Sequence, residues 1–310
     1  MTEKLQTLQN RPQPEQRTPA WYEFRHEHLT ASNAYKTFGS ECTRNQLIYD
    51  KCKPLCIEKY TGAVCLDSPM HWGQKYEPLS IKYYEEKYET QVAEFGCLPH
   101  PSLTCLAASP DGINMRPTSL RYGRMLEVKN IVNREITGIP KLEYWVQMQL
   151  QMEVFDLNEC DFLETRFVEY DDQAAFWADV AGDDVTLSKT GLKKGMMIVF
   201  SVGDKPIYVE APFNLTSAEQ LTAWETDVMQ EHEGQTWMQN IYWRLEEVSC
   251  VLVLRNKLWF KAAEPRLQEM WDIICKERMT GYEHRAPTKR ANATAVAAAA
   301  ATSSLIIMQQ

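Results

Sequence analysis

Two short acidic segments constrain the fold of this chain more strongly than any other feature of the sequence. Residues 109–112 read SPDG, and residues 126–129 read LEVK. Side chains alternate between the two faces of a strand, so Glu127 and Lys129 project together while their neighbours turn toward a core. Apolar flanks predict that both segments lie at buried strands, and the polar stretch from 116 to 123 favours a hairpin between them. The pattern predicts a sheet with two carboxylates and a lysine in one small patch.

That patch has the composition of a hydrolytic metal site. Asp111 and Glu127 supply hard oxygen ligands of the kind that Mg²⁺ and Mn²⁺ prefer. Lys129, beside such an ion, can hold or deprotonate an attacking water. The alternative is a solvated ion pair, which an E-x-K triplet on an exposed strand edge often forms. The apolar flanks favour the metal site, because an uncompensated buried charge costs on the order of several kcal/mol.

Five segments in the same order resemble the PD-(D/E)xK nuclease superfamily, and within it the lambda-type exonuclease and YqaJ-type viral recombinase family. Two of them are the acidic segments already described. The others are W-Y-x-x-R followed by L-T-A-S at 21–32, G-x-x-x-E-P at 73–78, and a glutamine-rich helical pattern at 144–154. The resemblance covers residues 21 to about 170. It implies an α/β fold, a restriction-endonuclease-like core with a central mixed sheet flanked by helices, followed by a helical C-terminal extension.

The resemblance also implies site residues. Asp111, Glu127 and the Val128 carbonyl would bind Mg²⁺, with Mn²⁺ as a substitute and one or two ions per site. Lys129 would position or activate the water, and Glu77 would have an accessory role toward the metal or the water. The residues implied for DNA binding are Arg25, Ser32 and Ser109 around a terminal 5′-phosphate, with Tyr144 and Gln147 beside them.

For three of these residues, the implied role can be compared with the local structure that the neighbouring sequence predicts. Ser32 is predicted as a helix N-cap, where free N–H groups attract an anion, and capping alone is the alternative. Glu77 precedes Pro78, which predicts the first turn of a helix, so a favourable interaction with the helix dipole is the alternative to a metal role. Gln147 and Gln151 are four apart, hence on one helical face, where neutral amides can position water or phosphate oxygens.

Length and residue patterns predict the domain organisation. A chain of 310 residues, 44% of them hydrophobic, can bury a large core. We expect a flexible N-terminal arm over 1–19, a nuclease domain over 20–210, a C-terminal extension of helices and strands over 211–286, and a low-complexity tail over 287–310.

Within the C-terminal part, four local patterns predict particular elements. Residues 196–209 read as a hairpin, and 248–254 read as a strand. Thr216 with Glu219 forms a capping-box pattern that opens a helix. Pro265 is expected at the start of a second helix.

The cysteine content and the C-terminal segment indicate where in the cell the protein is expected. Nine cysteines without regular pairing favour reduced thiols and an intracellular protein, in the host cytoplasm or nucleus if the source is viral, rather than a secreted one. Four of them could in principle ligate zinc, but their spacing lacks paired C-x-x-C units: Cys42, Cys52, Cys56 and Cys65. The uncharged stretch 291–310 is long enough for a membrane anchor, but its alanine, serine and threonine contribute little transfer free energy, so no membrane partner is expected.

The net charge of −9 is unusual for a protein that binds DNA. We expect a positive channel rather than a positive exterior. Its candidate residues form two groups in the sequence: Lys36, Arg44, Lys51, Lys53 and Lys59, and then Arg116, Arg121, Arg124 and Arg134.

Taken together, the residues predict metal-dependent hydrolysis of DNA phosphodiesters, and the resemblance implies a Mg²⁺-dependent DNA exonuclease that removes nucleotides 5′→3′ from duplex ends in viral or phage recombination or replication. The resemblance implies a single-strand annealing protein as partner and a homotrimer. Two alternatives remain, a structure-selective endonuclease or resolvase on the same core and a nonenzymatic DNA-binding protein. The residues themselves do not set the cleavage polarity, the processivity, the choice between DNA and RNA, the oligomeric state or the host.

Overall fold

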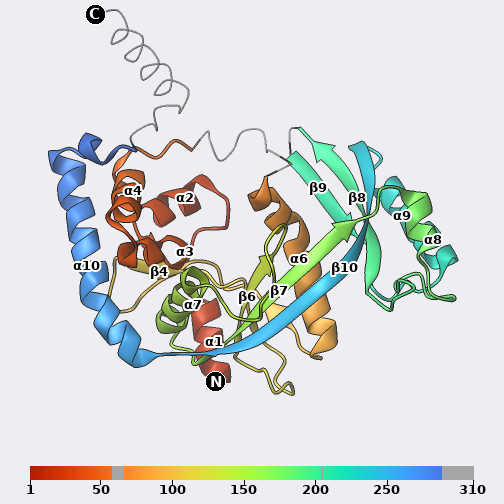
Figure 1. Cartoon of the computed structure of the whole chain (residues 1–310), viewed down its shortest axis with the longest axis horizontal. Coiled ribbons are helices and arrows are strands. Elements are labelled where there is room, and N and C mark those ends of the chain that lie inside the picture. The colour runs from red at the N-terminus through yellow and green to blue at the C-terminus, as the bar shows by residue number, and fades with distance from the viewer. Residues whose placement is uncertain (58–65, 67, 204, 288–310) are drawn as a thin grey trace, which may run out of the picture.

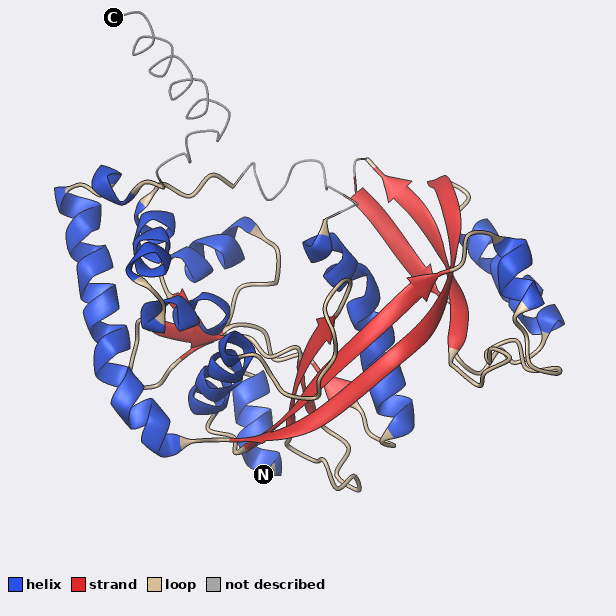
Figure 2. Ribbon diagram, viewed as in Figure 1, coloured by secondary structure: helices blue, strands red, loops and turns tan. Residues whose placement is uncertain are grey.

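The computed structural model describes residues 1–57, 66, 68–203 and 205–287. This part of the chain has the predicted α/β architecture, with a mixed sheet flanked by helices (Figures 1 and 2). The main sheet has seven strands, which in spatial order are β2 (Val92–Ala93), β5 (Gly112–Asn114), β6 (Met125–Asn130), β7 (Glu159–Glu169), β10 (Thr236–Leu254), β8 (Lys194–Val202) and β9 (Lys205–Glu210).

A small second sheet and the helices complete the fold. Its three strands, in spatial order, are β1 (Leu29–Thr30), β4 (Leu106–Ala108) and β3 (Leu98–Pro99). The helices are α1 (Thr2–Gln9), α2 (Pro19–His26), α3 (Ala31–Ala34), α4 (Glu41–Cys52), α6 (Pro69–Lys87), α7 (Leu142–Phe155), α8 (Gln173–Ala178), α9 (Ala218–Glu231) and α10 (Lys257–Thr280), with short 3₁₀ turns at Tyr35–Phe38 and Glu283–Arg285. Figure 1 shows α6 on one side of β6 and β7 and α7 on the other.

The predicted hairpin between the two acidic segments is present. Strand β5 pairs antiparallel with β6, with Gly112 opposite Leu126, and β6 then pairs parallel with β7. Leu126 and Val128 pack with Tyr84 of α6, so the intervening Glu127 faces α7. Glycine is required at 112, because a Cβ there would lie 2.1 Å from a methyl carbon of Val92 on β2.

Strand β10 crosses the middle of the sheet. It pairs with β7 along its C-terminal half and, at its opposite edge, with β8 along its N-terminal half, and each pairing contains one register shift. The expected strand over 248–254 is therefore only the end of a 19-residue strand. The predicted C-terminal extension contributes this strand to the same sheet as β5 to β7, and the domain boundary at residue 210 stays a prediction.

The N-terminal arm differs from the prediction. Residues 2–9 form α1, in which Leu5 and Leu8 are buried in the main core. Lys4 also forms an ion pair with Asp156 at 2.6 Å. The sequence pattern was too short to predict this helix, because its stability comes from packing against distant segments.

Two helix starts in the C-terminal part also differ. The capping box that opens α9 is formed by Ser217 and Gln220, one residue beyond the predicted pair. Helix α10 begins at Lys257, with Asn256 as its N-cap, so Pro265 lies inside the helix and not at its start. The predicted hairpin over 196–209 is confirmed as β8 and β9.

Some predictions lie outside the described residues. These are the tail beyond residue 287 and the positions of Lys59 and Cys65. Among the helices that the structure describes, none combines the length and the apolar character that crossing a bilayer requires.

Candidate active site

The predicted patch forms where β5 begins and β6 runs beside it. Asp111 directly precedes β5, and its Oδ2 accepts a 2.6 Å hydrogen bond from the backbone N–H of Val128. On β6, the Lys129 ammonium forms an ion pair with Oε1 of Glu127. Hairpin register and strand alternation thus bring the three predicted side chains together.

Glu127 is completely buried, and helix α7 supplies hydrogen bonds to both of its oxygens. The side-chain amides of Gln147 and Gln151 donate to Oε1 and Oε2, each at 2.7 Å. Gln151 also donates to the backbone carbonyl of Ser109, at 3.1 Å. The sequence placed both glutamines on one helical face, but only Gln147 was predicted at the site. The spacing of four residues was the signal for Gln151.

Charge is concentrated in this patch. Burial and the nearby Glu127 raise the pKa of Asp111 well above its usual value. Burial and Glu127 also raise the pKa of Glu77, against the opposing effect of Lys129 and Arg17. Burial opposes the charge on Lys129, but the two carboxylates of the hairpin raise its pKa. The carboxylates therefore repel one another, and a cation between them would relieve that repulsion.

One cleft joins Asp111 and Glu77 to the predicted phosphate-binding residues, whereas Glu127, Val128 and Lys129 are not among the residues that line it. Within it, a guanidinium nitrogen of Arg25 donates to the hydroxyl of Ser32 at 3.2 Å. The guanidinium also lies over the ring of Trp21, 4.4 Å from its centre. Six of the predicted site residues line this cleft: Arg25, Ser32, Glu77, Ser109, Asp111 and Gln147.

The local structure around Ser32 and Glu77 differs from the prediction. Thr30, not Ser32, precedes helix α3, and no side chain caps that four-residue helix. Helix α6 begins at Pro69 with Ser68 as its N-cap, so Glu77 lies in the middle of the helix and not in its first turn. The Ser-Pro pair at 68–69 is the stronger start signal. Both side chains still reach the cleft.

Tyr144 lies beside Lys129 and not among the residues that line the cleft. The Lys129 ammonium is 5.2 Å from the centre of the Tyr144 ring, and the Arg134 guanidinium is 5.6 Å from it. The ring also packs on Phe162 of β7. The Tyr144 ring is therefore close enough for a cation–π interaction with the Lys129 ammonium.

The donor set fits a hard divalent cation. Two carboxylates and a backbone carbonyl are oxygen donors, and the repulsion between Asp111 and Glu127 favours a positive ion. Among the described residues, no three His, Cys, Asp or Glu side chains are placed to hold an ion together. The Val128 carbonyl, waters or substrate oxygens would have to complete the coordination, and Mg²⁺ commonly retains several waters.

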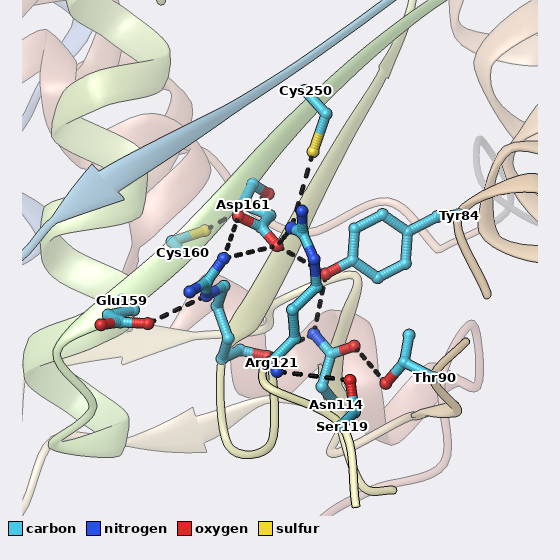
Figure 3. Close-up of polar contacts among 10 residues, drawn as sticks. Tyr84, Thr90, Asn114, Ser119, Arg121, Glu159, Cys160, Asp161 and Cys250 are labelled. Atoms are coloured by element: carbon cyan, nitrogen blue, oxygen red, sulfur yellow. Dashed lines mark hydrogen bonds and ion pairs between the residues drawn. The ribbon is translucent and has the colours of Figure 1, made fainter. Parts of the chain in front are cut away.

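Three of the four arginines in the second group of basic residues form ion pairs within the fold and not a free positive channel. Arg121 and Arg124 pair with Asp161 of β7, on the α6 face of the sheet, and Asp161 also accepts a 2.6 Å hydrogen bond from Tyr84 (Figure 3). Arg134 pairs in the same way with Glu164, another buried carboxylate of β7. These arginines neutralise buried carboxylates, which the sequence did not predict because the pairing depends on the position of β7.

The cleft is also lined by residues that the sequence did not predict at the site. Among them are Arg17, Gln74 and Glu94. Gln74 lies inside the G-x-x-x-E-P segment. Arg17 and Glu94 lie in no recognised motif, so the sequence carried no signal for them.

The comparisons with known proteins agree with the resemblance. Residues 20–158 match the YqaJ-like viral recombinase domain. The chain is 30% identical over 309 aligned residues to the uncharacterized protein R354 of Acanthamoeba polyphaga mimivirus, a match that covers 87% of this chain and 54% of that protein. The chain thus spans about half the length of the curated relative that it matches.

Two solved structures are similar to this one. An alkaline exonuclease from Laribacter hongkongensis has a TM-score of 0.48 and 18% identity, with 84% of this chain and 94% of that chain covered. A phage related exonuclease from Haemophilus somnus 129PT has a TM-score of 0.42 and 10% identity, with 82% of this chain and 96% of that chain covered.

Proposed function

Because the chain belongs to the YqaJ-like viral recombinase family through residues 20–158, we propose that it is a nuclease that cleaves DNA during viral or phage recombination or replication. The observation that supports this most directly is the cleft in which Asp111 and Glu77 meet the Arg25–Ser32 pair. A carboxylate site suited to a cation and a guanidinium suited to a phosphate lie in one cavity. In metal-dependent hydrolysis of a phosphodiester, the cation can stabilise the developing charge and activate water, and the guanidinium can hold a phosphate of the substrate.

In the proposed reaction, Asp111, Glu127 and the Val128 carbonyl would hold Mg²⁺, with Mn²⁺ as a substitute. One or two bound ions would supply Lewis-acid stabilisation of the charge that develops on the phosphate and would acidify a water. Lys129 would hold the attacking water at its ammonium. Gln147 and Gln151 fix the orientation of Glu127 through hydrogen bonds from their side-chain amides.

The finer proposal concerns the substrate. Arg25 can form charge-assisted bonds to a terminal 5′-phosphate, with the hydroxyls of Ser32 and Ser109 beside it. Such a site favours 5′→3′ removal of nucleotides from duplex ends. The family resemblance adds a single-strand annealing protein as partner, a homotrimer, and action inside a host cell, in the cytoplasm or nucleus.

The test is digestion of end-labelled linear duplex DNA by the full chain with Mg²⁺, and with EDTA as the metal-free control. The substrates are duplexes with a 5′-phosphate, duplexes with a 5′-hydroxyl, and covalently closed circles. We expect Mg²⁺-dependent release of nucleotides from linear DNA, fastest from phosphorylated ends, and no cutting of closed circles. Cutting of closed circles would instead support a structure-selective endonuclease, and no cleavage of any substrate would support a nonenzymatic DNA-binding protein.

A further inference from the structure

Arg17 reaches the candidate active site from outside the family domain. The match to the YqaJ-like domain begins at residue 20, and the recognised motifs begin at residue 21. Arg17 nevertheless lines the same cleft as Asp111 and Glu77.

The backbone of Arg17 adopts a conformation that favours glycine. Its φ is +65°, in the left-handed region that bulky residues rarely occupy. The turn is held by Thr18, whose N–H and hydroxyl both donate to the carbonyl of Glu15, at 3.3 and 2.7 Å. The same hydroxyl accepts the N–H of Trp21 and so caps helix α2. Such strain persists only where the surroundings impose it, and it is concentrated at functional sites.

The guanidinium of Arg17 is available to a ligand. The residue is exposed, and among the residues that the structure describes it donates no side-chain hydrogen bond and has no carboxylate within 4.0 Å. Arg25, by contrast, already contacts Ser32 and Trp21. A guanidinium carries five N–H donors in a planar fork, which matches the geometry of phosphate oxygens.

Arg17 also lies between two cavities. The neighbouring pocket shares Arg17 and Arg25 with the active-site cleft and continues to Lys51 and Lys53. A polyanion that extends from Asp111 and Glu77 toward Lys53, the more exposed of the two lysines, would pass the Arg17 side chain. This position suits contact with a backbone phosphate better than a role in the bond-breaking step.

We propose that Arg17 is a DNA-binding residue that contacts a backbone phosphate of the strand whose end occupies the Arg25–Ser32 site. The proposal rests on the proposed nuclease function and extends the site beyond the family domain. Arg17 raises the affinity for DNA and leaves the rate of the chemical step almost unchanged.

The experiment compares the full-length wild type with Arg17→Gln, Arg17→Lys and Arg17→Gly on a 5′-phosphorylated linear duplex with Mg²⁺ over a series of salt concentrations. Loss of one charge-assisted contact should raise KM about tenfold in Arg17→Gln, with kcat within about twofold. The slope of log KM against log salt should fall by about 0.7 to 0.9, the value for one phosphate contact. Arg17→Lys should keep the slope.

Arg17→Gly and a control variant, Arg11→Gln, separate an effect on DNA binding from an effect on folding. Arg17→Gly should show the same rise in KM as Arg17→Gln, while its Tm equals or exceeds that of the wild type, because glycine adopts a positive φ without strain. Arg11→Gln removes the same charge from the same segment, at a site where Arg11 contacts the Pro99 carbonyl. It should leave both KM and the salt slope unchanged.

An unchanged KM and salt slope in both Arg17→Gln and Arg17→Gly would overturn the proposal, as would an equal effect of Arg11→Gln. Binding of the protein to the same duplex is also measured by fluorescence anisotropy in the presence of EDTA, and this measurement does not require cleavage. If the wild type digests no DNA, the nuclease proposal fails, and the anisotropy still decides the role of Arg17. Weaker binding by Arg17→Gln than by Arg11→Gln supports the contact, and equal binding contradicts it.

Discussion

Gln151 of α7 donates a 2.7 Å hydrogen bond to Oε2 of Glu127, a carboxylate with no solvent exposure on β6. Together with Gln147 on Oε1, it leaves neither oxygen of this buried acid without a donor. Because an amide carries no charge, the two glutamines orient the carboxylate without neutralising it. Helix α7 therefore fixes the orientation of the Glu127 carboxylate through both of its oxygens.

Replacing Gln151 with leucine should weaken both the fold and the reaction. The substitution leaves Oε2 of Glu127 buried without a donor from α7, which costs on the order of 1–3 kcal/mol of stability. We expect a lower Tm and a cleavage rate reduced about tenfold or more, measured by thermal denaturation and single-turnover digestion. Gln268→Leu is the matched control, because that glutamine is exposed on α10, where among the described residues it donates to Asp272 and accepts a long contact from the Cys105 thiol. Equal behaviour of the two variants would contradict the role of Gln151.

Asp111→Asn, Glu127→Gln and Lys129→Met should each reduce Mg²⁺-dependent cleavage by about 10² or more, because each removes a ligand or water-positioning group from one cluster. Their effects should not add when the substitutions are combined. Asp111→Asn can still accept the Val128 N–H and relieves repulsion from Glu127, so its Tm should be no lower than that of the wild type. Near-native rates in either carboxylate variant would contradict the assignment of the site.

Arg25→Gln should remove the preference for phosphorylated ends. A dianionic 5′-phosphate completes charge-assisted bonds to the guanidinium, and a 5′-hydroxyl does not. In the wild type, phosphorylated duplexes should be digested faster than hydroxyl-ended ones, and in the variant both should be digested at the slower rate. Ser32→Ala should reduce the preference less, since it removes a neutral partner of Arg25. A wild type that digests both ends at one rate would contradict the phosphate site.

The ion pairs around Asp161 should contribute to stability and not to chemistry. Asp161→Ala leaves Arg121 and Arg124 without their buried partner, and the loss of one member of such a pair costs about 3–5 kcal/mol. Urea denaturation should show this loss. Glu27→Ala removes the exposed partner of Arg278 and should change the free energy of unfolding by about 1 kcal/mol or less. Similar losses in the two variants would contradict the interpretation.

Lys51 should make the stability depend on pH. Burial, and secondarily the charges of Arg25 and Arg278, lower the pKa of its amine from 10.5 to about 7. Between these two values the unfolded chain binds more protons than the folded one, so the stability of the wild type rises with pH. Lys51→Met lacks this titration. Relative to the variant, the wild type should therefore gain free energy of unfolding from pH 7 to pH 10, as measured by urea denaturation.

Lys53→Met is the control for that series. Lys53 is substantially exposed and pairs with Asp50, so its removal should leave the pH dependence of the wild type intact. Parallel stability curves for the wild type and Lys51→Met would show that the Lys51 amine keeps its ordinary pKa in the folded protein.

The sequence by itself determined the parts of the site that depend on local backbone geometry. Strand alternation placed Glu127 and Lys129 on one face, and the polar loop before β6 predicted the hairpin that brings Asp111 to them. Helical periodicity placed Gln147 and Gln151 on one face of α7. In each case the relationship spans few residues or one tight connection, and the period of the backbone is enough to specify it.

Only the tertiary structure decided the relationships between distant segments. Nothing in the pattern around Arg17 indicates that it reaches the cleft, because its position follows from the turn before α2 and from the arrangement of α2 and α6 around one cleft. The pairing of Arg121 with Asp161 depends on the register of β7. Pro78 and Pro265 lie inside long helices although proline usually marks a start, since the packing of α6 and α10 outweighs the local preference. Local propensities are weak compared with the burial of whole faces, and burial is known only once the chain is folded.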